Sequence, residues 1–253
     1  MEKDIIIGRN AVTEALKAGR SINRLLIAEG SRDGSIQKII SIAKERQIVF
    51  ESVSRDRLDK IAENQRHQGV VAYSAPVEYS TIEEILQAAA DRNESPFILL
   101  LDELEDPHNF GAILRTADAV GVHGVLIPKR RSVSLNSTVA KTSAGAVEYV
   151  KVAQINNVAQ TLKQLKDLNI TVIGSDMAGV DIFDSNNHID FNAPIVLIIG
   201  SEGKGMRRLT KENCDFLIRI PMVGRINSLN ASVAAAVVMY EVFRQRGILK
   251  KSD

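Results

Sequence analysis

The sequence predicts an α/β protein built around a mostly parallel sheet. Two continuous apolar runs, residues 97–101 (FILLL) and 195–199 (IVLII), are typical of strands buried on both faces of such a sheet. Helical stripes and short strands alternate along the chain, as in repeated βα units with helices on both faces. Tryptophan is absent and aromatic residues make up 4% of the chain, so we expect a core of Ile, Leu, Val and Ala.

Residues 1–75 predict a small α/β domain with its own core. Apolar residues recur there at helical spacing in three stretches and at strand spacing in three others. The expected helices are residues 10–19, 35–45 and 54–64, and the expected strands are residues 24–28, 47–53 and 69–75.

Residues 76–95 are expected to be a linker. The segment begins at Pro76, is followed by Pro96, is acidic, and holds one short helical pattern at residues 82–90. Residues 96–253 then form a second domain with stronger strands. Its expected strands are residues 97–101, 124–127, 148–152, 170–174, 195–199 and 216–220, and its clearest helices are residues 110–120 and 229–246.

The cysteine content and the N-terminal residues predict a cytoplasmic protein. Cys214 is the one cysteine, so no internal disulfide can form, which fits a reducing compartment. The apolar run at residues 5–7 is too short for a signal-peptide core or a membrane span.

Charge is spread unevenly along the chain. The net charge of +1 predicts no nucleic-acid partner by itself, but two basic regions at +3 and +2 flank the acidic segment at −4. A surface for RNA would therefore be local. The candidates are Lys129, Arg130 and Arg131, and Arg207 and Arg208, although solvated loop charges explain both groups equally well.

Three loops after predicted buried strands hold the polar residues of a candidate site, since ligands of open α/β sheets bind at the carboxyl ends of the strands. In the first loop, Asn109 stands where a helix N-cap is expected. Arg115 lies opposite the apolar face of the helix that follows. A capped helix with a surface arginine also explains this pattern.

The second loop, residues 200–205 (GSEGKG), is rich in glycine but fits no known phosphate-binding template. A P-loop requires GxxxxGK and then Ser or Thr, and a dinucleotide fingerprint requires a third glycine where Arg208 stands. The sequence therefore supports neither ATP nor NAD. Glu202 could bind a cation or orient a hydroxyl there, and a tight turn with an exposed carboxylate is the alternative.

The third loop, residues 220–232, leads into an alanine-rich helix. Ser228 or Asn227 is expected to cap that helix, and Asn230 and Ser232 add more polar groups than a cap requires. A well-capped, tightly packed helix is the alternative. Elsewhere, the scattered histidines and single cysteine lack zinc-site spacing, and we expect His67 to be a loop or hinge contact.

Together, the three loops resemble the SpoU/TrmH branch of the SPOUT methyltransferases. Order and spacing agree, the similarity covers residues 97–246, and Ala231 is a mild departure where valine is more usual. The matching stretches are residues 106–117 (DPHNFGAILRTA), 199–205 (IGSEGKG) and 220–232 (IPMVGRINSLNAS). Residues 7–16 (IGRNAVTEAL) and 65–69 (QRHQG) resemble the small RNA-binding domain of the ribosomal branch.

This resemblance implies a fold and a reaction. The C-terminal part of the sheet would form a trefoil knot, the first domain would be an L30e-like RNA-binding domain, and the chain would form a homodimer with its active site near the interface. The enzyme would transfer a methyl group from S-adenosylmethionine to a ribose 2′-hydroxyl, on a guanosine of 23S ribosomal RNA, free or in a precursor ribosomal particle.

The resemblance also implies roles for individual residues and no metal. Arg115 would act on the 2′-hydroxyl, although a guanidinium is almost always charged and accepts a proton only if its site makes it far less basic. The implied catalytic residues are Asn109, Arg115, Glu202, Ser228 and Asn230, and the implied cofactor-binding residues are Gly200, Ile220, Met222 and Leu229. Candidate RNA contacts in the first domain are Arg9, Arg20 and Arg24.

Two other functions stay open. The first is a transfer RNA ribose methyltransferase of the same family, against which the small N-terminal domain speaks. The second is a non-catalytic RNA-binding or ribosome-assembly protein, against which the intact set of site residues speaks.

Overall fold

The structure is a computed structural model that divides into two compact units. Unit 1 comprises Met1–Glu78 and Ser134–Tyr149, and unit 2 comprises Tyr79–Val133 and Val150–Asp253. No helix in the described part of the chain is long and apolar enough to cross a membrane. The residues that the structure describes are 4–31, 33–63, 65–184, 188–201, 203, 205–225 and 228–247.

Unit 1 is built on a four-stranded mixed sheet in the order β1-β4-β2-β3. β4 pairs antiparallel with β1 and β2, whereas β2 and β3 are parallel. Apolar side chains of three helices and the sheet form two buried clusters. The strands are β1 (Asp4–Ile7), β2 (Ile22–Ala28), β3 (Phe50–Val53) and β4 (Val70–Ser74), and the helices are α1 (Arg9–Lys17), α2 (Gly34–Glu45) and α3 (Arg55–Ile61).

Unit 1 also includes Ser134–Tyr149, which the sequence places within the second domain. This segment forms α6 (Ser137–Thr142) and the 3-10 helix η1 (Ala146–Glu148). Arg20 pairs with Glu148 at 2.8 Å, and both side chains are only 7% exposed. Arg20 is therefore an internal ion-pair partner, and the structure does not support it as an RNA contact.

Unit 2 is a six-stranded sheet in the order β10-β8-β9-β5-β6-β7, and every pair in it is parallel. The predicted mostly parallel α/β sheet is therefore confirmed. β5 and β9 are buried along their length, as their continuous apolar runs predict. The strands are β5 (Phe97–Asp102), β6 (Gly124–Pro128), β7 (Lys151–Ile155), β8 (Thr171–Asp181), β9 (Ile195–Gly200) and β10 (Phe216–Arg219).

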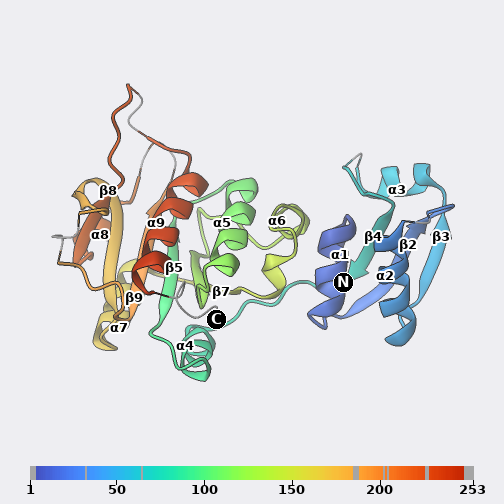
Figure 1. Ribbon diagram of the computed structural model, residues 1–253, viewed down its shortest axis with the longest axis horizontal. Coiled ribbons are helices and arrows are strands. Elements are labelled where there is room, and N and C mark those ends of the chain that lie inside the picture. Colours follow the sequence, from blue (N-terminus) through green and yellow to red (C-terminus); the bar gives the residue numbers. More distant parts are fainter. Residues whose placement is uncertain are drawn as a thin grey trace. The chain divides into compact units, whose positions relative to one another are not determined.

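Helices cover the sheet of unit 2. α5 and α9 pack against each other and lie side by side in Figure 1. The small residues of α9, such as Ala231 and Ala235, are buried and permit this close packing. The helices of this unit are α4 (Ile82–Asp91), α5 (Pro107–Ala119), α7 (Val158–Asp167), α8 (Arg208–Glu212) and α9 (Ala231–Gln245).

The acidic segment expected to be a linker is packed into unit 2 from Tyr79 onward. A capping box starts α4, with Thr81 as N-cap and Glu84 as its partner. Ile85 is fully buried in the core cluster that also contains Ile98 and Leu126. The segment therefore differs from the expected linker with one short helix, because the apolar side of α4 makes core contacts that the acidic composition does not reveal.

The burial of Ile85 gives a stability test. Ile85→Ala should lower the free energy of unfolding by about 2–5 kcal/mol, because it removes buried methyl groups and leaves a cavity. Gln87→Ala, on the exposed side of the same helix, should change it by less than about 0.5 kcal/mol. Urea unfolding measures both; equal, small effects would show that α4 does not contribute to the core.

Candidate active site

A cavity of about 330 Å³ lies at the carboxyl ends of β9 and β10, beside the middle of β8. This is the edge of the sheet where the sequence predicts a ligand site. Its lining includes all four expected cofactor-binding residues and one expected catalytic residue, Ser228. The lining residues are Ser175, Asp176, Met177, Ile199, Gly200, Ser201, Gly203, Gly205, Arg219, Ile220, Met222, Ser228, Leu229, Ala231 and Ala234.

The glycine loop after β9 folds back tightly on itself. Ser201 and Gly205 form an antiparallel bridge, with the Gly205 amide donating to the Ser201 carbonyl at 3.0 Å. A Cβ atom on Gly200 would lie 2.3 Å from the Gly205 carbonyl carbon, so the position requires glycine. Glu202, an expected catalytic residue in this loop, lies outside the described residues.

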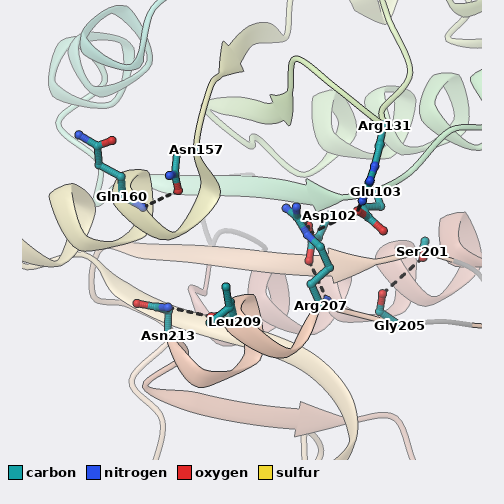
Figure 2. Close-up of polar contacts among 10 residues, drawn as sticks. All are labelled: Asp102, Glu103, Arg131, Asn157, Gln160, Ser201, Gly205, Arg207, Leu209 and Asn213. Carbon is teal, nitrogen blue, oxygen red and sulfur yellow. Dashed lines mark hydrogen bonds and ion pairs between the residues drawn. The ribbon is translucent and has the colours of Figure 1, made fainter.

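Asp102 joins the end of β5 to the end of this loop, as Figure 2 shows. Its side chain is fully buried and accepts hydrogen bonds from the backbone amide of Arg207 at 2.9 Å and from Arg207 Nε at 2.8 Å. A second guanidinium nitrogen of Arg207 lies 2.6 Å from Asp102 Oδ1. The loop is thereby fixed at Gly200, beside Asp102 in the sheet, and again at Arg207.

The N-cap of α5 is Asp106, so the prediction that Asn109 caps this helix is wrong. The Asp106 carboxylate accepts hydrogen bonds from the backbone amides of His108 at 3.1 Å and Asn109 at 3.0 Å. Pro107 occupies the first turn, where its missing amide hydrogen is no loss. Asn109 is therefore buried in the first turn with its side chain available for another contact.

That contact joins the first and third loops. Asn230 Nδ2 donates to Asn109 Oδ1 at 3.0 Å. Asn230 is also the N-cap of α9, since its Oδ1 accepts from the backbone amides of Ser232 and Val233. The prediction that Ser228 or Asn227 caps this helix is wrong for Ser228, and Asn227 lies outside the described residues.

Arg115 lies on α5 with an exposed side chain, as its position on the helical wheel predicts. It is not among the described residues that line the cavity. The structure therefore brings Asn109, Asn230 and Ser228 to one region and leaves Arg115 at the surface of the same helix as Asn109.

The middle of β8 supplies a wall of the cavity that the sequence did not predict. Asp176 Oδ1 accepts a hydrogen bond from Lys211 Nζ at 2.7 Å and another from the Ala178 amide at 2.9 Å. Partial burial alone would raise the pKa of Asp176, but the two hydrogen bonds outweigh it and lower the pKa. The carboxylate is therefore charged at neutral pH. The sequence feature that could have indicated Asp176 is its position directly after the buried first residues of β8.

Two other chemical groups have structural roles. His67 Nε2 contacts Asp59 at 3.0 Å, and His67 Nδ1 accepts from the Gly69 amide at 3.0 Å, which is the expected loop contact. Burial raises the pKa of the Cys214 thiol to about 11, so the thiol stays protonated at neutral pH. No cluster of metal-ligating side chains occurs among the described residues.

Family models match both parts of the chain. The model described as SpoU rRNA Methylase family matches residues 96–240, and the model described as RNA 2′-O ribose methyltransferase substrate binding matches residues 5–80. Relatives named as TrmH family tRNA/rRNA methyltransferases include one from Bacillus subtilis (strain 168), 51% identical over 97% of each chain. Another, from Staphylococcus aureus (strain MSSA476), is 48% identical over 97% of this chain and 98% of its own.

Solved structures share the fold. A crystal structure of an RNA 2′-O ribose methyltransferase is 27% identical, with a TM-score of 0.79 over 97% of this chain and 90% of its own. The SpoU methyltransferase AviRb from Streptomyces viridochromogenes, in complex with the cofactor AdoMet, is 24% identical, with a TM-score of 0.78 over 97% of this chain and 91% of its own.

Fold, cavity and matching models together define an RNA methyltransferase that depends on S-adenosylmethionine, which confirms the predicted enzyme class and cofactor. The chain belongs to the SpoU rRNA methylase family.

The close approach at Gly200 gives a binding test. Gly200→Ala should weaken S-adenosylmethionine binding by roughly tenfold or more, because the added methyl group forces the Ser201–Gly205 turn out of place. Gly34→Ala adds the same group where nothing lies within 4 Å and should leave binding unchanged. Isothermal titration calorimetry measures both; unchanged affinity in Gly200→Ala would contradict the role given to this turn.

Proposed function

We propose that this enzyme transfers a methyl group from S-adenosylmethionine to the 2′-hydroxyl of a guanosine ribose in 23S ribosomal RNA. The observation that carries the proposal is the hydrogen bond between Asn109 and Asn230 at 3.0 Å. It links the first and third sequence motifs, and Ser228, two residues before Asn230, lines the cavity.

The residues of the cavity fit S-adenosylmethionine. A volume of about 330 Å³ suits a small molecule, since such sites span about 300–1,000 Å³. Apolar side chains such as Ile220 and Leu229 suit an adenine ring. Bound S-adenosylmethionine supplies a methyl group activated by its sulfonium centre.

The protein must place the 2′-oxygen in line with that methyl group. Such positioning supplies up to about 7–11 kcal/mol in ideal cases. Asn109 and Asn230 fix each other's amide groups, so that one donor–acceptor pair has a defined orientation at the first turns of α5 and α9. We assign Ser228 and Glu202 to orienting the ribose beside this pair.

We assign Arg115 to the 2′-hydroxyl. A charged guanidinium can polarise the hydroxyl and bind the adjoining phosphate, and removal of the proton adds about 10²–10⁴-fold in rate where a base is available. Arg115 is exposed and does not line the cavity of its own chain, which fits a site completed by bound RNA or by a second subunit.

A homodimer with a knotted C-terminal region belongs to the same proposal. Val233 and Tyr240 of α9 are 48% and 52% exposed and give this helix an apolar outer surface suited to a second copy. β10 lies at the edge of the sheet, yet α9 returns to pack on α5 and β9, which fits a chain threaded past the glycine loop. We place the dimer in the cytoplasm, acting on ribosomal RNA or its precursor particle.

The share of this chain that each solved structure covers favours ribosomal RNA over transfer RNA as the substrate. The TrmH/SpoU tRNA modifying enzyme of A. aeolicus, 28% identical with a TM-score of 0.54, covers 66% of this chain and 85% of its own. The RNA 2′-O ribose methyltransferase structure covers 97% of this chain. The substrate-binding family model also matches residues 5–80. This additional domain supports an RNA substrate larger than the one that the simplest transfer RNA enzymes need.

Mapping of 2′-O-methylation in cells that lack the protein tests the substrate. We expect one guanosine of 23S RNA to lose its methyl group and to regain it when the protein and labelled S-adenosylmethionine are added to unmodified 23S RNA. Loss confined to transfer RNA would establish the transfer RNA alternative. No loss at any site would establish a non-catalytic RNA-binding protein.

Arg115→Ala tests the residue assignment. We expect methyl transfer to fall by about 10²–10⁴-fold, because the group acting on the hydroxyl is gone, while S-adenosylmethionine binding stays within twofold. Arg92→Ala, another exposed arginine of unit 2, is the matched control and should keep full activity. Single-turnover rates with labelled cofactor measure this, and retained turnover in Arg115→Ala would refute the assignment.

A further inference from the structure

A second hollow of about 650 Å³ lies at the carboxyl ends of β6 and β7. The two basic groups that the sequence left open, near residue 130 and near residue 207, both line it although they are far apart in the chain. We call it the arginine groove. Its lining residues are Pro128, Arg130, Arg131, Asn156, Asn157, Val158, Ala159, Arg207, Arg208, Leu209 and Thr210.

The arginine groove and the cofactor cavity are joined by one short stretch of chain. Gly200, Gly203 and Gly205 line the cavity, and Arg207 with the start of α8, as far as Thr210, lines the groove. Both lie at the carboxyl edge of the same sheet, with β5 between their strands. Figure 2 shows this edge, with Arg131 and Arg207 near Glu103 and Asp102. A nucleotide held at the cavity would therefore have its neighbours along this edge.

The four arginines of the groove differ in how they are held. Arg207 is fixed on Asp102 and serves the loop. Arg131 and Arg208 are 78% and 79% exposed, so their ion pairs are of little strength. Arg131 lies 3.7 Å from Glu103, and Arg208 pairs with the exposed Glu212. Arg130 is exposed and has no carboxylate partner within the described part of the chain. Three guanidinium groups can therefore turn to a ligand.

The lining also indicates which part of an RNA it suits. No aromatic side chain is among the described lining residues, so the groove offers no aromatic ring for a base to stack on. Guanidinium groups bind phosphate oxygens in bidentate geometry. The amide of Asn157 and the positive end of α7 add to the same preference.

We propose that the arginine groove binds the phosphodiester backbone of the substrate RNA beside the nucleotide that receives the methyl group. This inference rests on the proposed function, because it takes RNA to be the substrate. Contacts to phosphate carry affinity and no sequence information. The groove therefore positions the RNA, and recognition of the target sequence lies elsewhere in the protein.

The test uses the full-length double variant Arg130→Ala/Arg131→Ala, which removes two positive charges from the groove. Its control is Arg92→Ala/Lys163→Ala, which removes two positive charges from exposed positions of unit 2 outside the groove. Fluorescence anisotropy gives the Kd for a target RNA fragment and for an unrelated single strand at several salt concentrations. We expect the Kd of the groove variant to rise roughly tenfold or more for both RNAs. The slope of log affinity against log salt concentration should be smaller in magnitude by about 0.7 for each phosphate that the protein no longer neutralises. The KM for RNA should rise, while kcat and the Kd for S-adenosylmethionine should not change.

The binding measurement is independent of turnover, so its failure differs from failure of the proposed function. If the groove variant had the same RNA affinity and the same salt slope as the matched control, the proposed role of the groove would be refuted, even if the enzyme methylates 23S RNA. The proposed role would also be refuted if the groove variant bound inorganic phosphate more weakly but bound RNA normally. Loss of RNA binding in the groove variant supports the proposal even if 23S RNA proves not to be the methylated substrate.

Discussion

The pairing of Asp102 with Arg207 is the interaction on which the arrangement of the site depends. A fully buried carboxylate costs several kcal/mol in desolvation, on the order of what a charged partner with good geometry can return. Arg207 provides that partner with its side chain and with its backbone amide. The backbone bond matters most, because it fixes the chain at the point where the glycine loop ends and α8 begins.

The two ends of the loop after β9 thus have different anchors. At Gly200 the backbone approaches Gly205 so closely that no side chain fits, and at Arg207 a buried charge holds the chain. On the other side of the cavity, Asn230 caps α9 and bonds to Asn109 of α5. Segments from three parts of the sequence are in this way held at one edge of one sheet, which suits a reaction that needs accurate positioning.

The sequence predicted the sheet well because short, continuous apolar runs such as those of β5 and β9 are typical of strands buried on both faces. It predicted the three loops as one site because their positions at strand ends and their family resemblance agree. Helix caps were harder to predict. Asp106 and Asn109 are both good N-cap residues, and only the structure shows that Asp106 caps α5 and so leaves Asn109 for Asn230. Contacts between distant segments, such as Arg20 with Glu148, leave no local pattern at all.

Asp102→Asn in the full-length protein most directly tests whether one buried carboxylate organises both the cavity and the arginine groove. The substitution keeps the shape of the side chain and removes its charge. The Arg207 guanidinium then loses its ion pair, and an amide N–H replaces one of the two oxygens that accept hydrogen bonds from Arg207. On one folded preparation, the affinities for S-adenosylmethionine and for RNA are measured together with the thermal melting curve. We expect both affinities to fall while melting stays cooperative. Unchanged affinity for both ligands would contradict the central role of this interaction.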